Sequence, residues 1–267
     1  MFNVCLRKAA MTQDRKIQVH VPYPYILEKY ESLISSGINP EVYMDGFFIE
    51  EARPFDLERL HESFGGAGLS ITLHGPYMDM NPGSMEEPVR LSTARMYEKV
   101  FKVIEHLRPR AVVLHAGYHE KKYKGNFELW LSQSLKTWPP LVEEAERLGT
   151  VIAVENIFER EPSTLKLLMD SIESPNFGIC MDAGHLRVFS KVDMEEWFVS
   201  LGPKIAEVHL HDNHGKHDDH LPLGEGSIDI PRFLSLLNQY ANDPIYTIEP
   251  HGEDAMKRAI EAVKKYL

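Results

Sequence analysis

Side chains that bind metals and transfer protons are concentrated between Glu207 and Ile230, in the sequence EVHLHDNHGKHDDHLPLGEGSIDI. The segment begins with an apolar alternation at Val208 and Leu210, which is typical of a strand, and ends in a glycine-rich turn. A polar stretch rich in histidine and aspartate lies between the two. Holding such groups together away from water is costly unless something pairs with them. The segment therefore predicts a divalent metal site at the end of a strand.

Residues of the same types stand at the ends of five other predicted strands. A single histidine in such a place is more often a hydrogen-bonded core residue. That explanation would have to hold at the same end of six strands together, so we interpret the set as one metal site. The nine candidate ligands are His74, His115, Glu155, Asp182, His185, His209, Asp218, His220 and Glu249.

The spacing and chemistry of these ligands fit a metal site. Asp182 and His185 are three residues apart, which lets both reach inward where a strand turns into a loop. Asp218 and His220 are two residues apart and share one side of an extended segment. A mixture of imidazoles and carboxylates suits zinc, with manganese as the alternative.

Eight β-rich runs alternate with helical patterns along the chain, which predicts an α/β (β/α)8 TIM barrel. In that fold the carboxyl ends of all strands meet at one face, where the candidate ligands would converge. We expect residues 1–15 to be a lead-in and residues 16–267 to form a single barrel domain. The predicted strands are Lys16–Val21, Glu41–Asp45, Leu69–His74, Ala111–His115, Val151–Glu155, Phe177–Asp182, Ile205–Leu210 and Ile245–Glu249.

Several helices are marked by their own signals. Apolar residues recur at three- and four-residue spacing over Val89–Leu107, and Pro139-Pro140 predicts a break near Trp138 within Phe127–Leu148. Pro231 is expected at the first position of a helix. Shorter helices are predicted over Ser163–Ser171, Met194–Leu201 and Asp254–Leu267. An open doubly wound sheet is the alternative fold, but Pro22-Tyr23-Pro24 follows the first strand where that fold would place a glycine-rich turn.

Composition limits the partners and the compartment. The formal net charge of −11 argues against binding to long nucleic acids, since proteins that neutralise phosphates are usually basic. No apolar run is long enough for a membrane helix, and no signal peptide is recognisable. The two cysteines, Cys5 and Cys180, make no disulfide framework. We expect a cytoplasmic enzyme with a small-molecule substrate, which could form a homodimer.

Other polar residues near the predicted site could contact a substrate. Lys121, Lys122, Arg160 and Arg187 could meet a phosphate group, although a solvated charge run is the simpler explanation of the lysines. The Gly224–Gly226 segment is too short for a phosphate loop, and we interpret it as a tight turn that presents Asp218 and His220. His20 in the first strand is expected to be a packing residue. Further candidates for substrate contact are Tyr77 and His211.

The motifs place these residues in a known context. The chain resembles the xylose isomerase-like TIM barrel superfamily over its whole length, and its metal-site pattern is most similar to that of the endonuclease IV (AP endonuclease family 2) group. The resemblance rests on the nine ligand positions, on His74-Gly-Pro-Tyr77, and on the Asp-x-His pair before Leu223-Gly-Glu-Gly226. In that group the nine ligands hold three zinc ions.

Two functions follow from this pattern. The full set of nine ligands favours a hydrolase that acts on a phosphoester of a small metabolite with two or three metals, where Glu155 or Glu249 takes a proton. The alternative is a sugar or sugar-phosphate isomerase or epimerase. The resemblance implies that such an enzyme would hold one metal with Glu155, Asp182, His209 and Glu249, that Glu155 and Glu249 would transfer the proton, and that the other histidines would bind hydroxyls.

Overall fold

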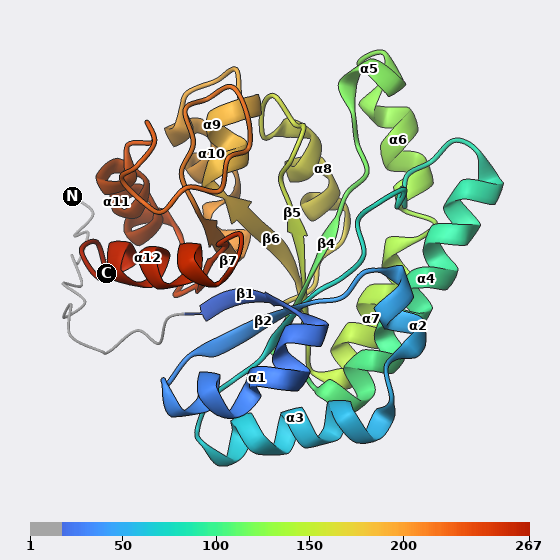
Figure 1. The fold of residues 1–267 in the computed structure, drawn as a ribbon. Helices are drawn as coiled ribbons and strands as arrows, with labels where there is room; N and C mark the ends of the chain where they lie inside the picture. The colour runs from blue at the N-terminus through green and yellow to red at the C-terminus, as the bar shows by residue number, and fades with distance from the viewer. Residues whose placement is uncertain (1–17) are drawn as a thin grey trace, which may run out of the picture.

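Eight parallel strands close into a barrel in the computed structural model, which describes residues 18–267 (Figure 1). Each strand pairs with the next along the chain, and β1 pairs with β8. This arrangement confirms the predicted TIM barrel. The strands are β1 (Gln18–Pro22), β2 (Asn39–Tyr43), β3 (Thr72–His74), β4 (Ala111–His115), β5 (Val151–Glu155), β6 (Phe177–Asp182), β7 (Ile205–Leu210) and β8 (Ile245–Ile248).

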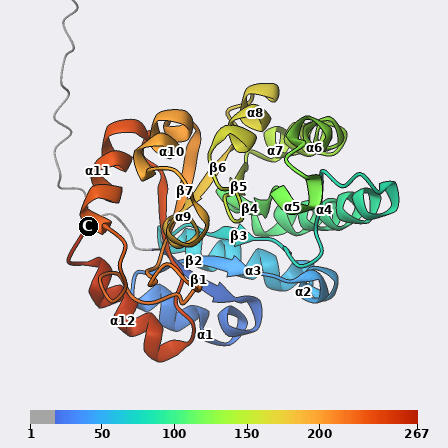
Figure 2. The same ribbon diagram turned by 90° about the horizontal axis from the view of Figure 1, so that it is seen from above.

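Helices surround the barrel, and the view from above shows them as an outer ring (Figure 2). Within residues 18–267 they outnumber the eight predicted segments, because several connections carry more than one helix. The helices are α1 (Tyr23–Ser35), α2 (Gly46–Glu51), α3 (Pro54–Gly66), α4 (Glu87–Leu107), α5 (Glu120–Tyr123), α6 (Phe127–Ser134), α7 (Trp138–Leu148), α8 (Ser163–Ser171), α9 (Ala183–Phe189), α10 (Met194–Leu201), α11 (Ile230–Tyr240) and α12 (Glu253–Val263), with a 3₁₀ turn at Gly202–Lys204.

Local signals account for several helix boundaries. The predicted break in Phe127–Leu148 is present, and α7 begins at Trp138 with prolines in its first turn, where their missing N–H groups are not needed. Asp193 caps α10 by accepting a hydrogen bond from the Glu195 N–H. Pro231 is the second residue of α11 rather than the first, because Asp229 is the cap and Ile230 begins the helix.

Alternation along the strands decides which side chains enter the barrel. On β7, Glu207 and His209 face inward while Val208 and Leu210 join the buried layer beneath the helices. Below the strand ends, Cys180 packs with other small apolar side chains and is fully buried, as expected for a small hydrophobe. Part of the interior is polar, since the Gln18 amide donates to the Glu207 carboxyl at 2.9 Å. Polar side chains therefore lie inside the barrel as well as at the carboxyl ends of its strands.

Some expectations fall outside this description. The predicted lead-in of residues 1–15, the first two residues of the predicted first strand and Cys5 lie outside the described residues. The division into a lead-in and one barrel domain stays a prediction. No helix within residues 18–267 has both the length and the apolar character needed to cross a bilayer.

Candidate metal centre and substrate cavity

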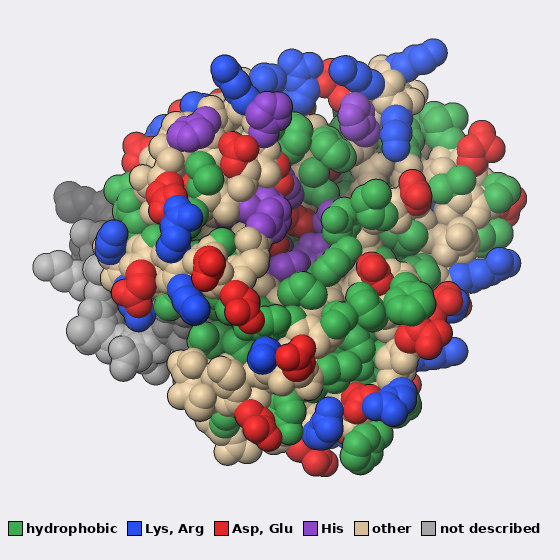
Figure 3. Space-filling model, in the orientation of Figure 1, with side chains coloured by type: hydrophobic (Ala, Val, Ile, Leu, Met, Phe, Trp, Pro, Cys, Tyr) green, Lys and Arg blue, Asp and Glu red, His purple; other side chains and the backbone are tan. Residues whose placement is uncertain are grey.

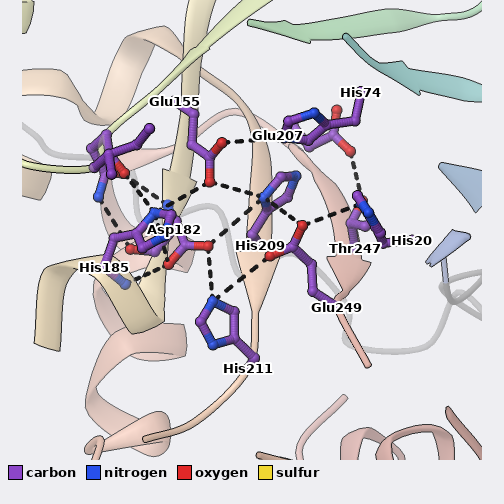
Figure 4. Close-up of polar contacts among 12 residues, drawn as sticks. His20, His74, Glu155, Asp182, His185, Glu207, His209, His211, Thr247 and Glu249 are labelled. Atoms are coloured by element: carbon purple, nitrogen blue, oxygen red, sulfur yellow. Dashed lines mark hydrogen bonds and ion pairs between the residues drawn. The ribbon is translucent and has the colours of Figure 1, made fainter. Parts of the chain in front are cut away.

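Three carboxylates converge on one nitrogen of His209 at the centre of the barrel mouth. Its Nδ1 lies 3.3 Å from Glu155 Oε1, 3.3 Å from Glu249 Oε1 and 3.8 Å from Asp182 Oδ2. Figure 4 shows the three acidic side chains, from β5, β6 and the end of β8, around the His209 ring. Ligand atoms about 2.1 Å from one ion lie roughly 3.0–3.5 Å apart, so these four side chains fit a single divalent cation.

Two histidines lie on the other side of Glu155. The Oε2 atom of Glu155 is 2.8 Å from His115 Nε2 and 3.4 Å from His74 Nε2. Glu155 is almost fully buried, and so is His74. With one oxygen toward His209 and the other toward this pair, Glu155 has the placement of a carboxylate that could bridge two cations.

A third group of ligands is built from the long loop after β7. Asp218 Oδ2 lies 3.2 Å from His185 Nε2 and 3.0 Å from His220 Nε2. The other oxygen, Asp218 Oδ1, is buried without a hydrogen-bond partner among the described residues, and it lies 3.7 Å from His211 Nδ1. An acceptor left unsatisfied beside imidazole nitrogens is a fitting place for a cation. The structure thus brings all nine predicted ligands together.

Hydrogen bonds orient the rings as metal ligands require. The Nδ1–H groups of three histidines donate to backbone carbonyls: His74 to Gly75, His185 to Asn156 and His220 to Glu249, at 2.9, 2.9 and 3.1 Å. When the ring is neutral, this fixes the tautomer in which Nε2 carries the lone pair, and each Nε2 faces a carboxylate. Metal-bound histidines show the same pattern, with the second nitrogen held by a carbonyl or a carboxylate.

The sequence reasoning missed two residues beneath this centre. Glu41 on β2 is fully buried and lies 3.2 Å from His209 Nε2 and 2.8 Å from His20 Nδ1. His20, expected to be a packing residue, also lies 3.3 Å from Glu249 Oε1 and lines the cavity. A carboxylate that accepts from Nε2–H leaves Nδ1 of His209 free for a cation. The sequence signal that could have revealed Glu41 was a charged residue inside an otherwise strand-like segment.

Other polar residues hold the ligand loops in place. Asp212 accepts backbone N–H bonds from Gly224, Gly226 and Ile228, so the predicted glycine turn folds around it. An isolated bridge between Asp212 and Leu221 closes the loop that presents Asp218 and His220. His220 itself has a positive φ of 50°, a conformation that is uncommon for a side-chain-bearing residue. The loop is therefore shaped for the position of its ligands.

The small size of Gly184 decides how closely α9 approaches His211. A Cβ atom at Gly184 would stand 1.9 Å from the His211 ring. The absence of that atom lets His211 Nε2 reach Asp182 Oδ2 at 3.0 Å. His211, predicted as a substrate contact, is thus a buried partner of a candidate ligand.

Burial and the charges of neighbouring groups shift the pKa values of the ligand cluster. Burial acts to raise the pKa of the Glu155 carboxyl, but the imidazoles of His209 and His115 outweigh it and hold this pKa well below its usual range. Burial and the charge of Glu41 raise the pKa of Glu207 well above its usual value. The pKa of His115 is lowered, mainly by burial. The carboxylates are thus ready to bind a cation at neutral pH.

We expect Glu41→Gln to weaken metal binding by about 10–100-fold, the usual effect of losing a carboxylate that orients a metal-bound histidine. The amide keeps the size of the side chain but removes the charge that favours Nε2–H on His209. Titration of the metal-free protein with Zn²⁺ against a competing chelator measures the change. Glu51→Gln on the exposed side of α2 is the control. Unchanged affinity in Glu41→Gln would contradict the proposed role.

Metal affinity should rise with pH. Burial lowers the pKa of His220, but the hydrogen bond that its ring donates to Asp218 and the charge of Glu249 outweigh it and raise this pKa to about 9 in the metal-free protein. The ring is therefore protonated at pH 7, and a cation must displace that proton. One displaced proton increases affinity by about tenfold per pH unit below pH 9. Calorimetry in buffers of different ionisation enthalpy measures the proton release, and pH-independent affinity would contradict this expectation.

A cavity of about 1350 Å³ opens above the centre, and Figure 3 shows histidine and acidic side chains within the hollow. Tyr77 and Lys122, two predicted substrate contacts, line it. Lys121 is exposed and not among the lining residues. Arg160 pairs with Glu120 at 3.0 Å, and Arg187 donates to Ser227 at 3.1 Å. Neither arginine is a lining residue of this cavity.

The chain is similar to known proteins along most of its length. The chain is 31% identical over 222 residues to an uncharacterized protein of Methanocaldococcus jannaschii, which covers 80% of this chain and 75% of that protein. It is 24% identical over 221 residues to a putative L-ribulose-5-phosphate 3-epimerase of Haemophilus influenzae, covering 77% of this chain and 74% of the relative. These relatives span most of the barrel.

A solved structure and a family model agree with this. The crystal structure of a D-tagatose 3-epimerase-like protein has a TM-score of 0.78 and 27% identity, covering 94% of this chain and 96% of its own. The family model described as the xylose isomerase-like TIM barrel matches residues 39–266. That range includes all nine candidate ligands, and the chain therefore belongs to the xylose isomerase-like TIM barrel family.

Proposed function

We propose that this protein is a divalent-metal-dependent sugar isomerase or epimerase in which Glu155 and Glu249 transfer the proton. One observation carries the proposal: these two carboxylates, from β5 and the end of β8, both lie 3.3 Å from the same nitrogen of His209. They therefore flank one point at the base of the cavity. The names of a similar structure, a D-tagatose 3-epimerase-like protein, and of a relative, a putative L-ribulose-5-phosphate 3-epimerase, support this alternative over the hydrolase that the sequence pattern favoured.

The chemistry requires a base and an acid on either side of a sugar carbon. A divalent cation bound by Glu155, Asp182, His209 and Glu249 would polarise the sugar carbonyl and so acidify the neighbouring C–H group. One glutamate would remove that proton, and the other would return a proton to the opposite face or to the next carbon. The depressed pKa of Glu155 keeps it ionised, as a base must be.

The cavity walls favour an uncharged sugar over a sugar phosphate. Lys122 is the one lysine or arginine among the lining residues within 18–267, and it is exposed. Several carboxylates face the same space, including Asp79, Glu159 and Glu253. Burial raises the pKa of Glu159 to about 7, so part of this group carries a proton that a sugar hydroxyl can accept. A dianionic phosphate finds no bidentate arginine here.

A ketose panel tests the proposal. The protein loaded with Mn²⁺ or with Zn²⁺ is incubated with D-fructose, D-tagatose, D-psicose and L-ribulose, and with the 5-phosphate of ribulose, and products are separated by chromatography. We expect interconversion of at least one ketose pair, with a higher kcat/KM for the free sugars than for the phosphate. Failure to convert any member under either metal would contradict the proposal.

Hydrolysis of a small phosphoester is the second candidate, and the two outer ligand groups favour it. A one-metal isomerase does not need His115 beside Glu155 at 2.8 Å or Asp218 between two imidazoles. Clustered cations can activate water and hold both oxygens of an in-line displacement. Release of p-nitrophenol from bis-p-nitrophenyl phosphate, together with two or three bound zinc ions per chain, would support this function instead.

A further inference from the structure

The cavity is larger than a sugar bound at its base would need. Pockets for drug-sized ligands usually measure about 300–1,000 Å³, and a free ketose is smaller than such a ligand. The cavity here measures about 1350 Å³. A ketose bound between Glu155 and Glu249 would leave much of this space, and the outer walls, without contact.

The unfilled part has a distinct chemistry. The cavity lining includes five apolar side chains from α1, the β3–α4 segment, the start of α4, the β5–α8 loop and α12, and we call them the apolar mouth: Tyr25, Met78, Val89, Phe158 and Met256. Met78 is 68% exposed and Phe158 is 46% exposed, which is unusual for large hydrophobic side chains within one concave wall. Figure 3 shows hydrophobic side chains gathered beside the hollow that holds the histidines.

An aromatic wall joins the apolar mouth to the metal centre. The Tyr77 ring stacks on His115 with centroids 5.1 Å apart and lies 5.8 Å from the Tyr43 ring. Tyr77 is 41% exposed, so a large part of its side chain remains open to a ligand. A molecule whose polar end reaches Glu155 can therefore extend along Tyr77 without leaving the cavity.

We propose that the substrate is a sugar bearing an uncharged aromatic substituent, which lies on the apolar mouth while the sugar reaches the metal centre. This proposal rests on the proposed sugar-converting function and extends it to the class of substrate. An aromatic group suits the site because planar rings stack on Tyr77 and Phe158. A charged substituent does not, since the lining of the cavity holds both Lys122 and the carboxylates Asp79 and Glu253.

A matched pair of ligands tests this directly. Phenyl β-D-glucopyranoside and methyl β-D-glucopyranoside share the sugar and differ in the substituent, and their affinities are measured by calorimetry on both metal-loaded and chelator-treated protein. We expect the phenyl compound to bind about tenfold more tightly or better, which corresponds to about 1.4 kcal/mol. Phe158→Ser and Met78→Ser should each reduce this ratio. Phe55→Ser, an exposed aromatic residue outside the cavity lining, should keep it.

The outcomes separate this proposal from the function on which it rests. A phenyl preference on the chelator-treated protein supports the aromatic subsite even if no ketose is converted. Equal affinities of the two glycosides would overturn it while leaving ketose conversion intact. Light scattering at several protein concentrations provides the second readout. A dimer whose dissociation is promoted by Met78→Ser would overturn the proposal, because the apolar mouth would then be covered by a second copy of the chain.

Discussion

We expect replacement of Glu249 by glutamine to lower the turnover of a ketose by about 10²–10⁴-fold, the range for loss of a positioned acid or base. The amide keeps an oxygen toward His209 and can still act as a weak metal ligand, but it cannot accept or return a proton. Glu249 is nearly buried, and its two oxygens contact His209 at 3.3 Å and His211 at 3.7 Å, so the amide should keep the same place. Product formation from the best ketose measures the effect.

Metal content separates chemistry from binding in this variant. Glu249→Gln should retain at least half of the metal bound by the unaltered protein, measured by elemental analysis after gel filtration. Glu253→Gln is the matched control, because Glu253 lines the same cavity but is exposed at its rim. A Glu249→Gln enzyme with full metal content and more than a tenth of the original kcat would contradict the proton-transfer role.

We expect removal of the divalent metal to abolish activity, and one equivalent of Mn²⁺ or Zn²⁺ per chain to restore it. The reason is that three buried acidic groups lie together around His209 with little water to separate their charges, and a cation would neutralise them. They are Glu155, Asp182 and Glu249. Without the cation the sugar carbonyl has no electrophile at the base of the cavity. Dialysis against a chelator, followed by stepwise metal addition with activity and metal content measured together, gives the stoichiometry.

Substitutions in the two outer ligand groups show how many metal ions the activity requires. If one ion suffices, His115→Ala and Asp218→Ala change KM by about tenfold or less, since each would lose only a hydrogen bond to the sugar. If the site works as a cluster, either substitution nearly abolishes turnover. Exposed His217 on the same loop provides the control, as His217→Ala. Activity that requires three equivalents of zinc would favour the hydrolase.

The sequence predicted the later strands best, and there is a physical reason. β4, β5, β6 and β7 have the predicted bounds. The first three are apolar runs that end in a ligand residue, and β7 carries its ligand His209 one residue before its end. β3 begins at Thr72 rather than Leu69, because the strand-forming residues that precede Thr72 do not pair with β2 or β4. β8 ends at Ile248, one residue before Glu249. Alternation within these strands was enough to aim the ligands on the strands at one volume, whereas His185 reaches it from α9, and Asp218 and His220 reach it from the loop after β7.

Glu41 and His20 show what alternation could not supply. Neither stands at the end of its strand, so neither was counted with the ligands, yet barrel closure places both under His209. For two basic residues, the sequence predicted a contact with substrate that the structure does not support. Proximity in the sequence placed Arg160 and Arg187 near the site, but their side chains pair with Glu120 and Ser227. Side-chain direction in loops depends on local partners, which strand periodicity does not encode.

Solvent exchange tests the central claim most directly. The metal-loaded protein is incubated in D₂O with each ketose of the panel, and deuterium at the carbons beside the carbonyl is measured by NMR. We predict incorporation at one such carbon with the unaltered enzyme, and a loss of about 10²-fold or more in rate with Glu249→Gln. No incorporation into any ketose, with rapid cleavage of bis-p-nitrophenyl phosphate by the same preparation, would contradict the proton-transfer function and establish the hydrolase instead.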